Sequence, residues 1–276
     1  MEKRMLVPKE IAEAIVAASV GRSKLSMIQM LVLSIFAGVF ISFGGVGAII
    51  ISQTLASIDP GLQRFAFAGI FPVGLMLVVI CGAELFTGNN LMTLGLLDDK
   101  LSLTSLLRSW TVVYFGNFIG SILIAGMVCY SGLMSGPIGE RAMAIASSKI
   151  TISLGPIIVR AILCNMLVVL AVWMATGAKD VTGKLLACWF PITLFVLSGY
   201  EHSVANMFFI PVGKFLGSDI TWGQMWINNV IPVTVGNIIG GAVIVPVVYY
   251  VAYIQPNKAV IPVPNEVSQE AIVKGV

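Results

Sequence analysis

Two short stretches of the chain place side chains that could bind a small solute and exchange its proton inside long apolar segments. Residues 82–89 include Thr87, residues 199–206 include His202, and both stretches read Gly-x-Glu-x-x-x-small-Asn. A hydroxyl and an imidazole both donate and accept hydrogen bonds, and imidazole also changes its charge near neutral pH. If the two stretches meet in the fold, Thr87 and His202 come within hydrogen-bonding distance. The alternative is that Thr87 only caps the helix that follows it.

The other polar groups of these stretches need partners, because ionisable and amide groups are costly inside a membrane. Glu84 and Glu201 occupy equivalent positions in the two stretches. They either line a solute path or accept hydrogen bonds from backbone N–H groups that a broken helix leaves open. In the second case they support the interruptions, together with the helix-loosening Gly199.

A metal site or an enzymatic centre is not expected around these stretches. His202 is the only histidine of the chain, and the four cysteines are scattered without a Cys-x-x-Cys pair. The chain also lacks the motifs of P-loop ATPases, zinc proteases and dinucleotide-binding enzymes. Ser203 adjoins His202, but neighbours on a helix do not face each other and cannot form a nucleophile–base pair. We therefore expect that the protein binds no cofactor and no metal and that it is not an enzyme.

The elements that must position these residues are membrane-spanning helices. The chain is 58% hydrophobic and 11% charged, with a mean hydropathy of +0.97, which is outside the range of soluble domains. Stretches of 18 or more mostly apolar residues recur, and this length crosses about 30 Å of hydrocarbon. The pattern predicts an all-α polytopic membrane protein in which the second and fifth spans are broken. The six predicted spans are 26–53, 64–96, 104–131, 152–176, 185–213 and 224–254.

A second repeated motif relates the two halves of the chain. Gly116-Asn117-Phe118-Ile119-Gly120 in the third span matches Gly236-Asn237-Ile238-Ile239-Gly240 in the sixth. Spans 2 and 3 therefore echo spans 5 and 6, and a repeat of three spans turns the second copy upside down. This indicates a 3+3 inverted repeat with a solute site near its axis. Asn117 and Asn237 are expected to face protein, water or solute rather than lipid.

The distribution of charge predicts how the chain is divided and oriented. Residues 1–25 are predicted to be a cytoplasmic amphipathic segment with a surface helix over 8–20, or alternatively a poorly ordered tail. Residues 26–254 are predicted to form a six-helix membrane domain, and residues 255–276 are predicted to form a cytoplasmic tail. With the N-terminus inside, eleven Lys and Arg residues fall on the cytoplasmic side and at most four fall outside, which favours two cytoplasmic termini in an inner-membrane protein. The four outside residues are Arg64, Arg141, Lys149 and Lys214.

Large apolar side chains flank the two interruptions. They are core packing by default, but a narrow apolar constriction on either side of a polar group would strip water from a passing solute. Lys149, just before the fourth span, either snorkels to water or concentrates anions at a channel mouth. Arg160 lies deeper in the same span, where backbone carbonyls or another subunit are the expected partners. The flanking apolar residues are Phe71, Leu75, Leu85, Phe86 and Phe195.

These motifs resemble the signatures of the formate/nitrite transporter family over about residues 8–254. The resemblance lies in Leu85-Phe86-Thr87 and in Glu201-His202-Ser203-Val204-Ala205-Asn206-Met207, and it extends to Trp189-Phe190-Pro191 and Gly236-Asn237-Ile238-Ile239-Gly240. It implies an aquaporin-like fold, a homopentamer in which each protomer has its own pore, and passage of small monovalent anions or their conjugate acids.

The resemblance also implies a role for individual residues. The break of the second span, called the Ω-loop, would contain residues 85–87, and the break of the fifth, the S-loop, would fall near residues 197–199. The resemblance assigns His202 and Thr87 to the central site, Phe71 and Phe195 to the outer constriction, Leu75 and Phe86 to the inner constriction, Asn165 and Asn237 to the polar pore lining, and Lys149 to the vestibule.

The expected function is a channel or transporter for formate or nitrite, with hydrosulfide as an alternative within the same family. A bare anion crosses an apolar constriction at a high desolvation cost, whereas a neutral acid does not pay it. The proton comes either from His202 or from water, with His202 only a hydrogen-bond donor. We predict that His202→Asn changes the pH dependence of flux more than it changes expression, and an unchanged profile would remove His202 from the proton path. The sequence leaves open which anion is physiological, whether flux is coupled to protons, and whether the N-terminal segment gates the pore.

A channel for water or neutral solutes is the main rival. Paired half-helix channels of that kind carry Asn-Pro-Ala at both breaks. Here the matching asparagines, Asn89 and Asn206, are followed by Asn90 and Met207 instead of proline. This difference favours the anion channel.

Overall fold

The computed structural model describes residues 4–258, so the predicted C-terminal tail lies outside the described residues from position 259 onward. In the described part of the chain the regular elements are helices, apart from one isolated bridge between Met5 and Ala178. In chain order the elements are α1 (Pro8–Ser23), α2 (Met27–Ser52), η1 (Leu55–Ser57), α3 (Pro60–Ile70), α4 (Val73–Cys81), α5 (Phe86–Asn89), η2 (Asn90–Met92), α6 (Thr93–Leu97), α7 (Leu103–Tyr130), α8 (Gly136–Ile150), α9 (Leu154–Gly177), α10 (Val181–Leu197), α11 (Ser203–Phe215), α12 (Trp222–Gln224), η3 (Met225–Val230), α13 (Ile231–Ile238), η4 (Ile239–Ile244), α14 (Val245–Tyr249), η5 (Tyr250–Ile254) and α15 (Gln255–Lys258).

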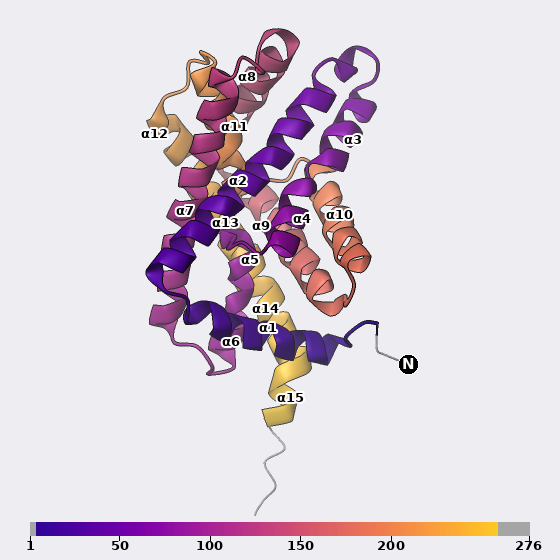
Figure 1. Ribbon diagram of the computed structural model, residues 1–276, viewed down its shortest axis with the longest axis vertical. Coiled ribbons are helices and arrows are strands. Elements are labelled where there is room, and N and C mark those ends of the chain that lie inside the picture. The colour runs from indigo at the N-terminus through magenta and orange to yellow at the C-terminus, as the bar shows by residue number, and fades with distance from the viewer. Residues whose placement is uncertain (1–3, 259–276) are drawn as a thin grey trace, which may run out of the picture.

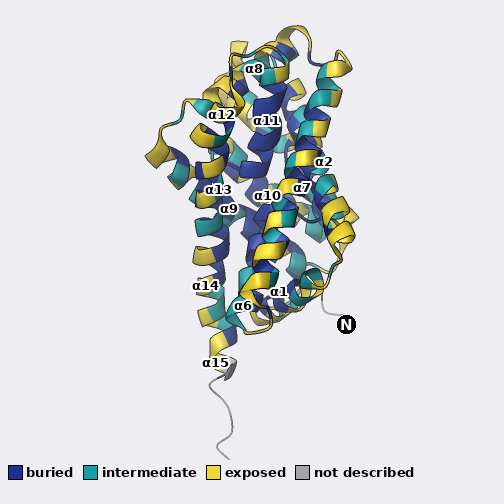
Figure 2. Cartoon of the chain, turned by 90° about the vertical axis from the view of Figure 1, so that its left-hand side faces the viewer, coloured by how far each residue is buried: buried dark blue, intermediate teal, exposed yellow. Residues whose placement is uncertain are grey.

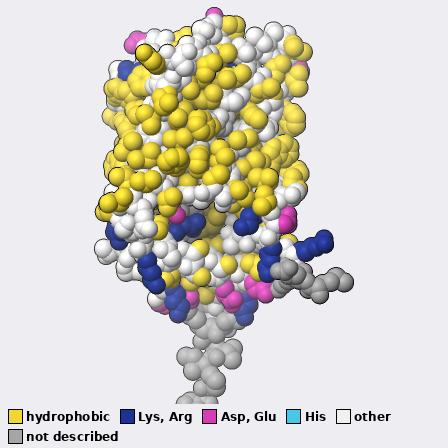
Figure 3. All heavy atoms as spheres, viewed as in Figure 1, with side chains coloured by type: hydrophobic (Ala, Val, Ile, Leu, Met, Phe, Trp, Pro, Cys, Tyr) yellow, Lys and Arg dark blue, Asp and Glu magenta, His cyan; other side chains and the backbone are white. Residues whose placement is uncertain are grey.

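The helices form an elongated bundle with α8 near one end and α1 lying across the other (Figure 1). Buried residues gather along the middle of the bundle, around α11, and exposed residues face outward (Figure 2). Apolar side chains cover most of the upper and middle part of the face seen in Figure 3, whereas charged side chains gather at the end that holds α1. Large apolar residues such as Phe36, Phe115 and Ile227 are exposed on the surface. A surface of this kind suits lipid and is unusual for a protein in water.

Five segments of the described chain are long and apolar enough to cross a membrane: Met27–Ser57, Pro60–Cys81, Leu103–Tyr130, Leu154–Gly177 and Trp222–Ile254. Helix α10 is also apolar but shorter, because the predicted fifth span is divided between α10 and α11. The predicted all-α membrane protein is confirmed at this level. The last segment contains three π-helical turns, η3, η4 and η5, which the sequence analysis did not predict.

The second and fifth spans are interrupted close to the predicted positions, but Phe86 and Thr87, which the resemblance placed in the Ω-loop, are the first two residues of α5. Residues 82–85 separate α4 from α5, and residues 198–202 separate α10 from α11. Each break contains a glycine with positive φ, 77° at Gly82 and 73° at Gly199. A Cβ disfavours this backbone conformation, so glycine is the residue that allows the chain to leave the helix here. The second span is also divided at Pro72, between α3 and α4, which was not expected.

Helix α1 is longer than the predicted 8–20 and packs onto the bundle. Ile11 and Ile15 are buried in one apolar cluster with Leu94 and Trp173. The alternative of a poorly ordered tail is therefore wrong for α1. Helix α8, at the other end of the bundle, was not predicted at all, although it contributes to the site described below.

Close contact between α2 and α7 depends on glycines. A Cβ on Gly38 would overlap the carbonyl oxygen of Asn117, and a Cβ on Gly120 would overlap that of Ile35. Gly240 approaches the backbone of α9 in the same way. Small residues at such positions allow the backbones of membrane helices to approach closely.

Gly120→Ala should destabilise the protein more than an alanine elsewhere on α7. The added methyl group must displace backbone rather than a flexible side chain, which costs about 1–3 kcal/mol. Gly126→Ala is the matched control, because a Cβ at Gly126 meets no atom within 4 Å. We expect the Tm of the purified protein to fall by several degrees for Gly120→Ala and not for Gly126→Ala. Equal Tm values would contradict the close approach of α2 and α7.

Candidate functional site

The two breaks bring Thr87 and His202 together in the interior of the bundle. The hydroxyl oxygen of Thr87 lies 2.9 Å from Nε2 of His202, although the residues are 115 positions apart. Both side chains are buried. Thr87 does not cap α5, whose N-cap residue is Leu85. The predicted encounter of the hydroxyl and the imidazole is therefore present in the structure.

A backbone contact orients the His202 ring. Nδ1 accepts a hydrogen bond from the N–H group of Ala205 at 3.0 Å, which makes His202 the N-cap of α11. A neutral ring in this position carries its hydrogen on Nε2, the atom that faces Thr87. The ring then donates to the Thr87 oxygen, and the hydroxyl hydrogen is left for another acceptor. A second proton on Nδ1 would point at the Ala205 N–H group and break the cap.

Two buried asparagines, one for each break, bind the backbone that the interrupted helices leave open. Oδ1 of Asn237 accepts a hydrogen bond from the N–H group of Ser203 at 2.9 Å. Its Nδ2 donates to the carbonyl oxygens of Ala161 and Glu201, at 2.8 and 3.0 Å. Asn237 therefore faces protein backbone, one of the alternatives that the sequence left open. Asn117 makes the same three contacts at the other break, with the N–H of Phe86 and the carbonyl oxygens of Ser34 and Glu84.

The two buried glutamates bind side chains, and the expectation that they accept backbone N–H groups is wrong. Glu201 accepts hydrogen bonds from Nζ of Lys149 and Nδ2 of Asn206, both at 2.7 Å. The reason is that the two asparagines described above already take N–H groups at the starts of α5 and α11, which frees the carboxylates for cationic and amide donors. Glu84 is bound in the same manner by Arg22 at 3.3 Å and by Asn89 at 2.6 Å.

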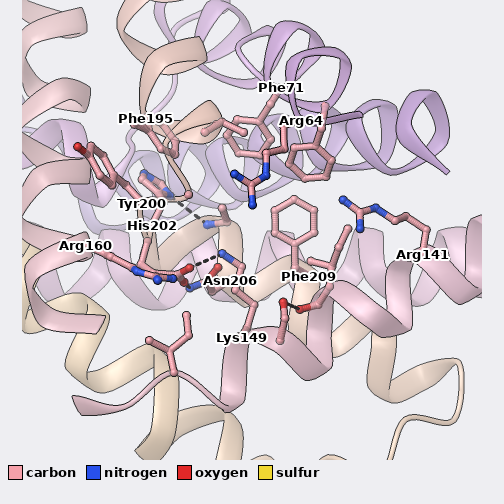
Figure 4. Close-up of a pocket in the computed structure, with 18 residues that line it drawn as sticks. Arg64, Phe71, Arg141, Lys149, Arg160, Phe195, Tyr200, His202, Asn206 and Phe209 are labelled. Carbon is pink, nitrogen blue, oxygen red and sulfur yellow. Dashed lines mark hydrogen bonds and ion pairs between the residues drawn. The ribbon is translucent and has the colours of Figure 1, made fainter. Parts of the chain in front are cut away.

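Two cavities approach the Thr87–His202 pair from opposite ends of the bundle. The first, the α8-side pocket, has a volume of about 300 Å³, and His202 is one of its lining residues. The second, the α1-side pocket, has a volume of about 450 Å³ and reaches Gly88 and Asn89. Figure 4 shows the α8-side pocket, with Phe71 and Phe195 near His202 and charged side chains around them. The described residues contain no group of three or more His, Cys, Asp or Glu side chains that could hold a metal ion.

Aromatic rings line the α8-side pocket next to His202. The Phe195 ring is stacked on the His202 ring with centroids 5.8 Å apart, and it meets Phe71 edge-on at 6.0 Å. Phe209 stacks on Phe71 at 6.1 Å and also lines the pocket. Phe209 was not predicted as a site residue. Its position in α11, seven residues after His202, could have indicated it, because residues seven apart lie on one face of a helix.

On the other side of the polar pair, Leu75 and Leu85 line the α1-side pocket. Phe86 is not among the lining residues of that pocket. Its ring packs edge-on against Tyr114 and Trp110 of α7, with centroids 4.9 and 6.0 Å apart. The structure thus places Leu75 and Leu85 on the wall of this pocket, and it puts Phe86, which the resemblance assigns to the inner constriction, in the contact between α5 and α7.

Asn165 lies in the interior of the bundle and lines neither pocket. Its Nδ2 atom donates to Oδ1 of Asn90 and to the carbonyl oxygen of Asn237, both at 2.7 Å. Its Oδ1 atom is buried with no hydrogen-bond partner in the described structure. Asn165 was predicted as a site residue and Asn90 was not. Two consecutive asparagines in an apolar span could have indicated a structural role for Asn90.

Comparison with known proteins gives one consistent result. A family model described as "Formate/nitrite transporter" matches residues 9–251. The "Probable formate transporter" of Methanothermobacter thermautotrophicus is 42% identical over 267 residues, which covers 90% of this chain and 97% of that protein. A solved structure titled "FNT family ion channel" has a TM-score of 0.82 at 29% identity, with 88% of this chain and 98% of the other covered. A "Pentameric formate channel with formate bound" has a TM-score of 0.75 at 32% identity, with 82% and 97% covered.

Proposed function

The chain belongs to the formate/nitrite transporter family, and from this premise we propose that it conducts formate across a membrane past the Thr87–His202 pair. The observation that carries the proposal is the buried 2.9 Å contact between the Thr87 hydroxyl and Nε2 of His202. In this contact Nε2–H donates to the Thr87 oxygen; when an oxyanion arrives, this N–H and the hydroxyl hydrogen both turn to the oxygens of the solute. A relative named as a formate transporter and a solved neighbour with formate bound support formate as the solute. Nitrite and hydrosulfide are the alternatives.

The proposed architecture is an aquaporin-like 3+3 inverted repeat of six spans, assembled as a homopentamer. Each half contributes one broken span, one asparagine that binds the break, and one glutamate that pairs with a cation and an amide. Matched contacts of this kind are expected when two copies of a unit face each other across a pseudo-two-fold axis in the membrane plane. The neighbour whose title calls it pentameric supports the assembly.

We further propose that the α1 end faces the cytoplasm and that the α8-side pocket opens to the outside of the inner membrane. The division of the chain into residues 1–25, 26–254 and 255–276 is part of this proposal. The excess of Lys and Arg in the segments assigned to the cytoplasm supports it. The charged side chains near α1 in Figure 3 agree with this orientation.

The transport step follows from the low polarity of the path. An anion that enters either pocket must lose water to pass Phe71 and Phe195 or Leu75 and Leu85, and the desolvation of a bare charge is costly. At the polar pair, Nε2–H of His202 and the hydroxyl of Thr87 replace part of the lost hydration. Beyond it, the neutral acid crosses the second constriction more easily than the anion does.

The position of His202 favours water as the source of the proton. Nδ1 is occupied by the Ala205 N–H group, so the neutral ring offers one hydrogen, on Nε2. Transfer of that hydrogen would leave an imidazolate, and storage of an extra proton would break the cap of α11. We therefore propose that His202 acts as a hydrogen-bond donor and that the acid takes its proton from water in a pocket.

Flux measurements in proteoliposomes test the proposed function. Initial rates for formate, nitrite, hydrosulfide and acetate should be compared between pH 5 and 8 with imposed pH gradients. We expect formate to be fastest and acetate slower, because the methyl group of acetate must also pass between the Phe71 and Phe195 rings. Protein-free liposomes correct for direct diffusion of the neutral acids.

Two results would contradict the proposal. One is a formate rate no higher than that of protein-free liposomes at every pH. The other is osmotic water flux without any anion flux, which would revive the water-channel alternative.

A further inference from the structure

The two pockets differ in charge. Four cations and one carboxylate line the α8-side pocket, which gives a net charge of +3: Arg64, Arg141, Lys149 and Arg160 against Glu201. Two cations and one carboxylate line the α1-side pocket, which gives a net charge of +1: Arg22 and Lys184 against Glu84. A cavity with a one-sided charge raises the local concentration of oppositely charged solutes.

Lys149 does not carry the charge difference. Its ammonium group lies 2.7 Å from Glu201, whose side chain is 3% exposed, so this pair is close to neutral as seen from the pocket. The uncompensated charge comes from the three arginines. None of them forms an ion pair with an acidic side chain among the described residues, and Glu201 is the one acid among the described residues that line the α8-side pocket.

The arginines reach the pocket from three separate helices, Arg64 from α3, Arg141 from α8 and Arg160 from α9. In Figure 4 the guanidinium groups of Arg64 and Arg141 lie on either side of the Phe209 ring. The Arg141 guanidinium lies 5.9 Å from the centre of the Phe67 ring, and its Nε atom is buried without a hydrogen-bond partner in the described structure. A guanidinium group that lines a cavity and has no acidic partner can bind an anion that enters it.

The Lys and Arg residues assigned to the outer side are also unevenly distributed. The positive-inside bias leaves four Lys and Arg residues, as predicted, on the outer side. Three of those four, together with Arg160 from a spanning helix, line this pocket, and only Lys214 lies elsewhere. Cations on this side are therefore concentrated at the pore entrance instead of being spread over the surface.

We propose that Arg64, Arg141 and Arg160 form a binding site for small planar oxyanions in the α8-side pocket, ahead of the Phe71–Phe195 constriction and separate from the Thr87–His202 pair. The guanidinium fork matches two oxygens of a planar oxyanion better than it matches a single-atom anion. The site makes entry from the α8 side saturate at a lower formate concentration than entry from the α1 side. This inference rests on the proposed function, since formate is taken as the solute.

Formate uptake into right-side-out and inside-out membrane vesicles from the same cells tests the site. Each Arg→Gln variant should raise the apparent KM about threefold in right-side-out vesicles at low salt, the effect of removing one charge about 7 Å away in water-like surroundings. The triple variant should raise it on the order of 20-fold if the charges act independently. In inside-out vesicles the KM should stay the same. The difference should shrink above ~0.15 M salt because the charges are then screened.

Lys214→Gln is the matched control, because it removes an outer positive charge that binds the carbonyl oxygen of Ile220 and lies outside the pocket. It should leave the KM unchanged. Arg160→Lys keeps the charge but loses the guanidinium fork, so its KM should lie between those of the natural protein and Arg160→Gln. A triple variant with unchanged right-side-out KM, or an Arg160→Lys variant with the KM of the natural protein, would overturn the arginine site while formate conduction stands. No formate uptake by the unaltered protein would overturn both the site and the proposed function.

Discussion

Replacing Asn237 with alanine should abolish transport and lower the stability of the protein, far more than the loss of an exposed amide would. The side chain satisfies one N–H group and two carbonyl oxygens at the second break, all of them buried. Each of these three buried groups costs about 1–3 kcal/mol when it is left without a partner, so the loss is on the order of 3–9 kcal/mol. The backbone of residues 199–203 would then lose the conformation that presents His202.

Thermal unfolding of the purified variant and formate flux in proteoliposomes check this prediction together. Asn237→Asp keeps an oxygen for the Ser203 N–H group but cannot donate to the two carbonyl oxygens. Its Tm and its formate flux should lie between those of the natural protein and of Asn237→Ala. Asn228→Ala, at an exposed position of η3 in the same span, is the matched control and should be neutral. An Asn237→Ala protein with natural Tm and flux would show that water replaces the amide, and that the break does not depend on this side chain.

The two asparagines also illustrate what the sequence could predict. The repeated Gly-Asn motif and the cost of an amide in lipid were sufficient to expect Asn117 and Asn237 next to polar groups. The glycines at the breaks indicated where the spans are interrupted, since a helix tolerates positive φ poorly. These are local properties, and they can be read from spacing alone.

The partners of Glu84 and Glu201 were not predictable in the same way. A carboxylate near a helix start is a reasonable acceptor for open N–H groups. In the structure the N–H group at the start of α5 or α11 instead donates to an asparagine on another helix, more than 30 positions away in sequence. Competition between two acceptors depends on the tertiary approach of helices, and the spacing of residues within one helix contains no information about it.

Helix α8 was missed because its apolar side is narrow. Glu140, Arg141 and Lys149 interrupt the stretch, so it resembles a polar connection between two spans. Its buried residues nevertheless recur at helical spacing, at Gly139, Ala142, Ile145 and Ala146. Without α8 the sequence could name Arg141 and Lys149 as outer charges but could not bring them to the wall of one pocket.

The second large effect is expected at His202. In His202→Asn the shorter side chain can still accept the Ala205 N–H hydrogen bond, because asparagine is a good N-cap residue. The asparagine side chain is too short to place a second donor where Nε2 was, so it cannot also hydrogen-bond to Thr87 and to a solute. A lost hydrogen bond to a charged group is worth about 1.5–3 kcal/mol, so formate flux should fall about 10- to 100-fold. In Thr87→Val the formate flux should fall by a similar factor, since this change removes the other member of the pair without a change in size.

The double variant His202→Asn with Thr87→Val distinguishes a functional pair from two independent contacts. If the solute oxygens bind both groups at once, removal of the second donor costs less once the first is gone, and the two effects do not add. Retention of the cap in His202→Asn predicts that the Tm and the oligomer size stay close to those of the natural protein. Full additivity of the flux losses would contradict a shared site.

The pH profile of the remaining flux decides how the proton travels. If water supplies the proton, the rate follows the concentration of formic acid, and it declines with increasing pH in the same way in His202→Asn and in the natural protein. If the ring supplied the proton, the variant would lose part of that dependence between pH 5 and 8. We expect parallel profiles at a lower rate, because the Ala205 N–H group occupies Nδ1 and leaves His202 one hydrogen to offer. A flattened profile in the variant would mean that the cap opens during each passage and that His202 takes part in proton transfer.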